Sequence, residues 1–510
     1  HDPEFAAASL FERAYLELAA KLGSEPLVPS LERTGGSISR FETVVIPPSA
    51  GYLEATLLRV ERIVKFLLWQ RGGHTLYCGG PAVIGEYLAK EYYPSGERAF
   101  DYDFMTGVYE QPFAIKSCTA AEAPETKETG IALGRHLEGC RVGFDLGASD
   151  RKASAVINGE AVFSEEVVWD PRNATDPDYH YQGVMDSIRR AASHLPRLDA
   201  VGGSAAGVYI NNRPRVASLY RGVPKDQFEA KIAPMFERMG QELGVPFEVV
   251  NDGEVTALAG SMSLGENPVL GLAFGSSLAA GYVNREGNIT GWLNELAFVP
   301  VDYRPGAPKD EWSGDGGCGV QYFNQVGSNR ISTAAGITYA EGQPLPERLV
   351  ELQKLMAAGN EVAAEVYDTI GVMLGYAIAH YSTFYDLKNI LVLGRVTTGK
   401  GGDIVLESAK KVLEAEFPEL AARISVALPD EKSRRVGQSI AAAGLDPRVT
   451  LIAAGVPAIC DHSGKAAGRI NGWPKLVPDE NGVPDAKILQ VARYFDAMNF
   501  ATRAKAQAGV

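Results

Sequence analysis

The feature that most constrains this chain is an internal repeat at an offset of 128 residues. The segment VGFDLGAS at 142–149 returns as LGLAFGSS at 270–277, and a second apolar run follows each copy. Glycine turns between apolar runs predict two strand–turn–strand hairpins, one in each half of a duplicated fold. Three pairs of positions coincide at this offset: Gly143 with Gly271, Gly147 with Gly275, and Ser149 with Ser277.

The residues around the first copy predict a mixed sheet. Tight turns separate three apolar runs, so we expect an antiparallel meander. Helical and strand-like segments then alternate, which is typical of an α/β sheet. The meander runs are 141–146, 152–157 and 160–168, and the later segments are helices 182–195 and 225–243 and strands 200–204 and 247–250.

Composition argues against several classes of protein. The formal net charge of −14 disfavours nucleic acid as a partner. The five cysteines form no CxxC pair, which favours a cytoplasmic location over a disulfide scaffold. Neither a signal peptide nor an apolar run of 18 residues is evident, so we expect no membrane contact. Residues 1–5 look like an expression remnant.

The two glycine turns are candidate phosphate sites. Backbone N–H groups and hydroxyls in such turns form concave donor surfaces for anions, and two copies could hold a polyphosphate from both sides of a cleft. Asp145 ends the strand before the first turn, where its carboxylate can hold Mg²⁺ through water. Taken alone, either turn is better explained as an ordinary hairpin, and only the pairing favours the functional interpretation.

A polar pair lies between the two copies. Asn251 and Asp252 follow the apolar run 247–250 and open a helical segment. Asp252 can accept the proton of a hydroxyl nucleophile, as phosphotransfer requires. The alternative is that Asp252 serves only as the N-cap of that helix.

In this order, these segments resemble the ROK family of the actin–hexokinase ATPase superfamily. The resemblance covers residues 140–445, about 60% of the chain. It implies an α/β fold: a duplicated RNase H-like fold with two lobes, here with an extra N-terminal domain. The matching segments are 145–152 (first phosphate motif), 202–207 (glycine turn before the sugar-side loop), 251–257 (catalytic base), 273–277 (second phosphate motif) and 391–394 (strand entering the nucleotide-side loop).

The resemblance implies an ATP- and Mg²⁺-dependent kinase that phosphorylates a sugar or a related polyol. Asp252 would be the catalytic base and Asp145 the metal ligand. A homodimer is implied by analogy alone. The implied substrate residues are Ser204, Asn251, Asp252, Asn294 and Glu295, and the implied nucleotide residues are Asp145, Gly147, Ser149, Lys152, Gly275, Ser276, Ser277 and Gly394.

One departure from the family concerns its zinc motif. The pattern Gly-Glu-x-Gly-His, whose His ligates zinc, becomes Asn294-Glu295-Leu296-Ala297-Phe298 here. Phe298 replaces the His, and Cys318 alone cannot build a four-ligand site, so we expect no structural zinc. The altered motifs leave an alternative open: a sugar-sensing ROK protein without catalysis, or a transcriptional regulator.

Two further segments bear on other functions. Residues 394–401 match GxxxxGK, but Gly401 stands where a P-loop needs Ser or Thr, so a loop on the nucleotide side is expected. Residues 41–110 hold 6 Lys plus Arg against 9 Asp plus Glu, a poor balance for DNA binding. A lid or an oligomer contact is expected instead.

The expected organisation has four parts after residues 1–5. They are an N-terminal extension at 6–139, a first lobe at 140–258, a second lobe at 259–445 and a tail with a helix at 446–510. Within the extension we expect helices at 6–23, 52–70 and 82–92, a strand at 75–78, and a linker at 116–139.

Overall fold

The computed structural model describes residues 1–128, 139–147, 150–158 and 160–428. The predicted tail, 446–510, therefore lies outside the described residues. The chain forms two compact units. Unit 1 comprises His1–Ala132 and Thr256–Pro429, and unit 2 includes Leu133–Val255. The N-terminal extension and most of the second predicted lobe thus share one unit.

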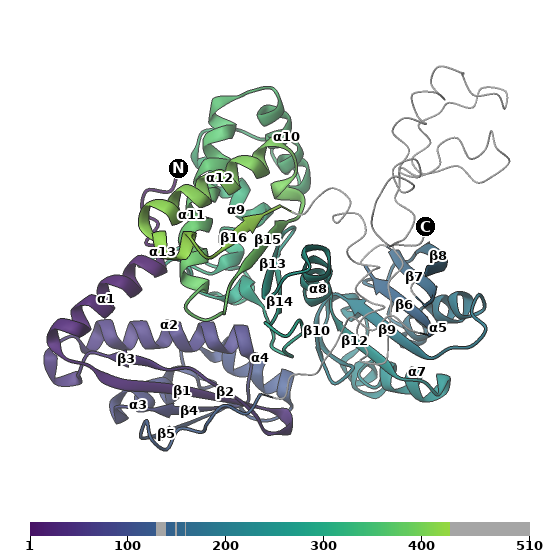
Figure 1. Ribbon diagram of the computed structural model, residues 1–510, viewed down its shortest axis with the longest axis horizontal. Helices are drawn as coiled ribbons and strands as arrows, with labels where there is room; N and C mark the ends of the chain where they lie inside the picture. The colour runs from purple at the N-terminus through teal and green to yellow at the C-terminus, as the bar shows by residue number, and fades with distance from the viewer. Residues whose placement is uncertain (129–138, 148–149, 159, 429–510) are drawn as a thin grey trace. The chain divides into compact units, whose positions relative to one another are not determined.

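Unit 2 is built on a five-stranded sheet in the order β12-β9-β6-β7-β8 (Figure 1). The strands β6, β7 and β8 form the predicted antiparallel meander. The strands β9 and β12 extend the sheet in parallel on the other side of β6, which requires crossover connections. The bounds are β6 Cys140–Leu146, β7 Asp150–Ile157, β8 Glu160–Val168, β9 Ala200–Ala205 and β12 Phe247–Asn251, with a small hairpin of β10 Val208–Ile210 and β11 Arg213–Val216.

Helices and a buried core complete unit 2. Phe144 of β6 packs in one apolar cluster with Ile188 of α5 (Pro177–Ala192) and Phe236 of α7 (Met235–Leu243). The helix expected at 225–243 is not continuous. It consists of α6 (Lys225–Gln227), a π-helical turn (Phe228–Ile232) and α7. Pro234 explains the break, because it has no N–H to continue the helical ladder.

The second copy of the repeat forms a sheet of unit 1 in the order β14-β13-β15-β16. The strands β13 and β14 pair antiparallel, whereas β15 pairs parallel with β13 and β16 pairs parallel with β15. This is the strand order of unit 2 without the third meander strand, so the predicted duplicated RNase H-like fold is confirmed. The bounds are β13 Val269–Phe274, β14 Leu278–Val283, β15 Asn389–Leu393 and β16 Ser425–Ala427.

The helix α8 Asp252–Leu264 begins in unit 2 and continues into unit 1 from Thr256. The other helices of this lobe are α9 Gln325–Ala334, α10 Leu345–Ala357, α11 Glu361–Tyr381, α12 Lys400–Glu416 and α13 Pro418–Ala421. Of these, α11 is long and apolar enough to cross a membrane. Most of its apolar window is buried, and it packs along α12 and against α1 and α9. We therefore interpret α11 as a core helix.

The N-terminal region adds a second sheet to unit 1, in the order β2-β1-β4-β5, with β3 pairing the other end of β1. The predicted helices at 6–23, 52–70 and 82–92 are confirmed. The strands within residues 25–45 were not expected, because Pro26 and Pro29 are residues that argue against a strand at β1. The strand β5 extends into the first residues of the expected linker. The bounds are α1 Ala8–Leu22, β1 Glu25–Arg33, β2 Ser37–Arg40, β3 Thr43–Val45, α2 Leu53–Arg71, β4 Thr75–Gly79, α3 Ala82–Glu91, α4 Ala99–Tyr109 and β5 Ala114–Cys118.

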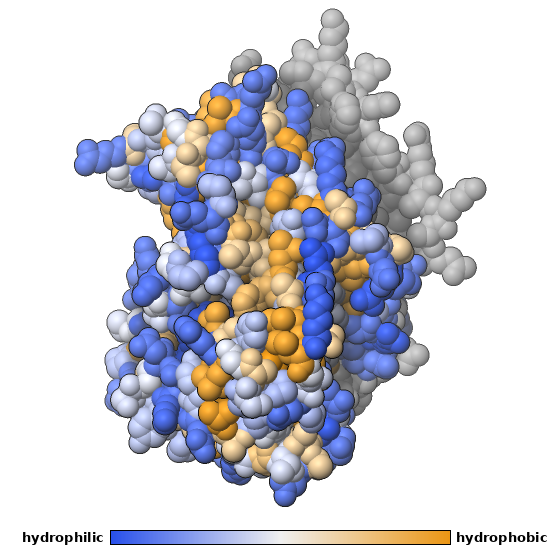
Figure 2. Space-filling view, turned by 90° about the vertical axis from the view of Figure 1, so that its left-hand side faces the viewer, coloured by the Kyte–Doolittle hydropathy of each residue, from blue (hydrophilic) through white to orange (hydrophobic). Residues whose placement is uncertain are grey.

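One face of the molecule carries a band of apolar residues between hydrophilic ends (Figure 2). Large apolar side chains on α1 and α2 are among the exposed ones, at Leu16, Leu22 and Leu58. Isolated exposed leucines are ordinary on a folded protein, so this face by itself indicates no partner.

Candidate functional site

The carboxyl ends of the parallel strands in unit 2 bring predicted site residues together. Asp145 of β6 is in register with Ser204 of β9, which is in register with Val250 of β12. Asn251 ends β12, and Asp252 is the first residue of α8. Parallel strands share one polarity, so residues that end different strands meet at one edge of the sheet.

Asp145 is a buried carboxyl group with an unusual proton affinity. Asp145 is only 5% exposed, and this burial raises the pKa of its carboxyl group to about 6. Ser204 and Lys152 favour the charged form, whereas the charges of Asp252 and Asp150 oppose it. A buried carboxylate whose charge is opposed by two other carboxylates is stabilised by a bound divalent cation.

Asp252 starts α8 with a half-buried side chain. Burial raises its pKa, and backbone N–H groups at the helix start, including that of Gly253, lower it in part. Asp252 therefore has the position at a helix start that the N-cap alternative requires, and it also has a raised pKa. A raised pKa makes Asp252 a better proton acceptor than a surface aspartate.

Asn251 holds the backbone around this pair. Its Nδ2 donates to the carbonyl of Gly207 at 2.7 Å, and its Oδ1 accepts from the N–H of Gly253 at 2.7 Å. The side chain therefore fixes the turn after β9 to the start of α8 and orients Asp252. The predicted contact of Asn251 with a sugar stays a prediction.

The first glycine turn follows β6. The N–H of Gly147 donates to the carbonyl of Asp150 at 2.9 Å, and the indole of Trp169 donates to the carbonyl of Gly147 at 2.9 Å. Lys152 lies 3.4 Å from the carboxylate of Asp150. Ser149, a predicted phosphate ligand, lies outside the described residues.

The second glycine turn, in unit 1, exposes its hydroxyls. Ser276 and Ser277 are exposed, and the N–H of Gly275 donates to the carbonyl of Ser277 at 3.0 Å. The start of α9 lies against this turn, because the N–H of Gln325 donates to the carbonyl of Gly275 at 3.0 Å and Asn324 caps the helix. A helix N-terminus beside exposed hydroxyls favours an anion there.

Gly394 follows β15 in a backbone conformation that favours glycine, at φ 102°. A Cβ atom there would lie 2.5 Å from the carbonyl oxygen of Phe274, the last residue of β13. The turn after β15 therefore lies directly against the end of β13. Its predicted role beside the nucleotide stays a prediction, as does the role of Lys400 at the start of α12.

Replacing Gly394 with alanine is expected to lower the free energy of unfolding of unit 1 by about 1–3 kcal/mol, since the new methyl group adds a backbone clash to φ strain. Gly399→Ala is the matched control: its φ is 72°, but nothing lies within 4 Å of the new Cβ. Thermal unfolding of both variants separates the clash from the strain. Equal losses would show that no close approach exists at Gly394.

The predicted sugar segment lies in unit 1 at residues 294–298. Asn294 is 1% exposed, adopts φ 51° and accepts a hydrogen bond from the hydroxyl of Tyr385 at 2.9 Å. Glu295 is half-buried. Phe298 is buried against Trp69, with ring centroids 4.4 Å apart. Asn294 has a structural role here, and sugar contacts of Asn294 and Glu295 stay predictions.

Within the described part of the chain, no group of three or more His, Cys, Asp or Glu residues is placed to hold a metal ion. Mg²⁺ needs fewer protein ligands, because it keeps several waters and also binds substrate phosphates. Asp145, with Asp150 and Asp252 near it, fits that requirement, while the expected lack of a structural zinc stays a prediction.

Comparisons with known proteins add the following. No protein-family model and no curated protein matches the chain. Among solved structures, a ROK hexokinase from Thermus thermophilus is 18% identical, with a TM-score of 0.47 over 60% of this chain and 97% of its own. A ROK-family glucokinase from Streptomyces griseus, solved with glucose and AMPPNP, is 18% identical, with a TM-score of 0.42 over 57% and 94%. The chain resembles ROK-family structures. A ROK-family transcriptional regulator, a homolog of Escherichia coli Mlc, is also similar, at 15% identity and a TM-score of 0.45 over 59% and 76%.

Two residues that hold the glycine turns, one in each unit, were missed by the sequence analysis. Trp169 holds the first glycine turn, and Asn324 holds the second by capping α9 and donating to the carbonyl of Ser276 at 3.4 Å. Asn324 carries a sequence signal, because an Asn before a helical run is typical of an N-cap. Trp169 carries none, since its partner is a backbone carbonyl 22 residues earlier.

Proposed function

We propose that the chain is an ATP-dependent kinase that transfers a phosphoryl group to a hydroxyl of a sugar or related polyol, with Mg²⁺ as cofactor. The observation that carries this proposal is the pair Asp145 and Asp252 at one sheet edge of unit 2. Both carboxyl groups have raised pKa values, and each lies at the end of its strand or the start of its helix. Phosphotransfer needs one group to hold the metal and another to accept a proton.

The residues divide these tasks by chemistry. Asp252 accepts the proton of the acceptor hydroxyl, and Asn251 keeps its carboxylate oriented. Asp145 holds Mg²⁺, which neutralises phosphate charge when bound. In unit 1, the exposed hydroxyls of Ser276 and Ser277 are the expected donors for phosphate oxygens. Such catalysis consists mainly of positioning and electrostatic stabilisation.

The test is ADP release with Mg-ATP across a panel of hexoses, amino sugars and polyols. ADP that depends on the acceptor would support the kinase and identify the substrate class. Binding of a sugar without ADP, detected by thermal shift, would replace the kinase with a sugar sensor. Salt-dependent binding to duplex DNA without ADP would replace it with a regulator.

A further inference from the structure

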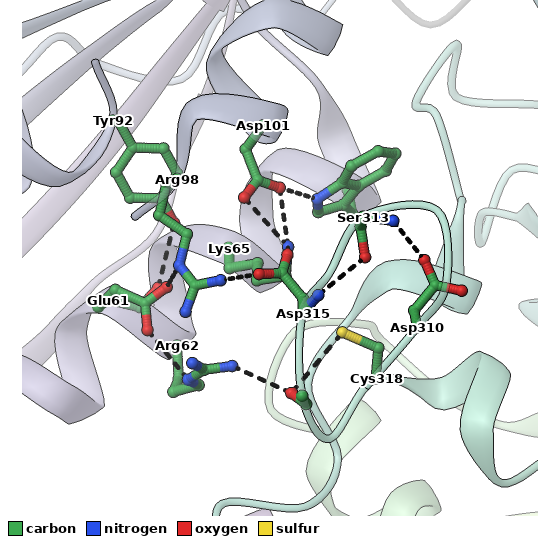
Figure 3. Close-up of polar contacts among 12 residues, drawn as sticks. Glu61, Arg62, Lys65, Tyr92, Arg98, Asp101, Asp310, Ser313, Asp315 and Cys318 are labelled. Atoms are coloured by element: carbon green, nitrogen blue, oxygen red, sulfur yellow. Dashed lines mark hydrogen bonds and ion pairs between the residues drawn. The ribbon is translucent and has the colours of Figure 1, made fainter. Parts of the chain in front are cut away.

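A buried cluster of charged side chains joins three segments of unit 1 (Figure 3). Lys65 of α2 donates to both carboxylate oxygens of Asp101 in α4, at 2.8 and 3.1 Å, and also to Asp315. Arg98, just before α4, pairs with Asp315 and with Glu61 of α2, the latter at 2.6 Å. Asp315 belongs to the loop 309–319, which the catalytic proposal does not use.

The cluster is closed and electrically balanced. Lys65 is fully buried, and the four residues paired around it are at most 9% exposed. Burial lowers the pKa of Lys65, but the carboxylates of Asp101 and Asp315 outweigh it and leave the pKa raised. Three cations thus face three carboxylates: Lys65, Arg62 and Arg98 against Glu61, Asp101 and Asp315.

The same elements hold the segment 294–298 through its backbone. The N–H groups of Asn294 and Glu295 donate to the carbonyls of Gln70 and Trp69, the last turn of α2, at 2.9 and 3.0 Å. Trp69 also links segment and cluster, because its ring packs on Phe298 and its indole N–H donates to Asp101.

The loop that carries Asp315 is joined to the same segment from the other side. The N–H of Val301 donates to the carbonyl of Gly317 at 2.8 Å, and the N–H of Gly319 donates to the carbonyl of Val299 at 3.0 Å. The ring of Trp312 meets that of Phe298 edge-on, with centroids 5.3 Å apart. A shift of Asp315 would therefore move residues 298–301 with it.

We propose that Lys65 and Asp315 are positioning residues, through which the N-terminal region fixes the Glu295 segment for the acceptor substrate. Buried ion pairs are weak stabilisers compared with apolar packing, but their geometry is satisfied in one arrangement only. The cluster thus selects one position of the loop 309–319 and of residues 294–301. The part of the inference that concerns substrate rests on the proposed function.

The test compares the wild type with Asp315→Asn, which leaves Lys65 paired with Asp101 and Arg98 paired with Glu61. We expect amide hydrogen exchange in residues 294–301 to accelerate at least tenfold. We also expect KM for the sugar to rise about tenfold, with KM for ATP unchanged within twofold, because a misplaced ligand weakens acceptor binding. The double variant Lys65→Met/Asp315→Asn restores charge balance, so its exchange should be slower than that of Lys65→Met alone.

Glu12→Gln is the matched control. Glu12 of α1 pairs with Arg59 of α2 at 2.8 Å in an equally buried ion pair, and the other hydrogen bonds of Arg59 go to Thr43 and Val44 rather than to the segment 294–301. It should lose stability without faster exchange in that segment. Equal exchange in Asp315→Asn and Glu12→Gln, or parallel rises in KM for sugar and ATP, would overturn the proposal. If the wild type phosphorylates no acceptor, the proposed function fails, and hydrogen exchange still decides whether the cluster positions the segment.

Discussion

Asp252→Asn is expected to lower kcat for phosphotransfer by about 10²–10⁴-fold, the range for loss of a positioned proton acceptor. The amide keeps the shape of the side chain but cannot take the hydroxyl proton. Sugar binding, measured by thermal shift, should persist. Because burial raises the pKa of Asp252, wild-type kcat should fall as the pH drops through that raised pKa, and the variant should lose this acidic limb.

The control for this prediction is Asp176→Asn. Asp176 also lies at a helix start, where its carboxylate accepts from the N–H of Asp178 at 2.9 Å, but the helix that it caps is α5 and not α8. Because Asn caps a helix about as well as Asp, this change should alter stability by less than about 1 kcal/mol and leave kcat unchanged. Full activity in Asp252→Asn would reduce Asp252 to an N-cap and remove the proposed base.

Asp145→Asn is expected to abolish Mg²⁺-dependent ADP release and, at pH 7, to stabilise the metal-free protein. The pKa of Asp145 is about 6 in the folded chain against an ordinary 3.8, so folding takes up a proton between these values. Stability contributed by this group therefore falls as the pH rises from about 4 to about 6 and stays low above that. The difference corresponds to about 3 kcal/mol at neutral pH.

Thermal unfolding between pH 4 and 8, with and without Mg²⁺, tests whether Asp145 lowers the stability of the metal-free protein and binds the cation. The variant should lack the fall in stability between pH 4 and 6, and Mg²⁺ should raise Tm only in the wild type, because a ligand stabilises the state that binds it. Asp199→Asn is a control of opposite sign: hydrogen bonds from Arg197 and from the Cys140 N–H lower the pKa of Asp199, so its loss should destabilise. A less stable Asp145→Asn at pH 7 would contradict the assignment.

The comparison of expectation and structure shows which features are local. The repeat of Gly143 at Gly271 predicted two hairpins, and both lie at the same place in their sheets, because turn chemistry and apolar alternation act over a few residues. Asp145, Ser204 and Asn251 lie at the same edge of the sheet because β6, β9 and β12 are parallel neighbours. The strand β1 was missed because its two prolines carry the opposite local signal.

The amino-acid sequence by itself determined the duplicated fold and the candidate base, since alternation, turns and helix starts are encoded within short segments. Only the tertiary structure decided what the N-terminal region does in unit 1. Lys65 and Asp315 are 250 residues apart in sequence, and the carbonyl of Gln70 meets the N–H of Asn294. No local pattern marks such pairs, because each side chain gains a partner only once distant segments have packed and excluded water.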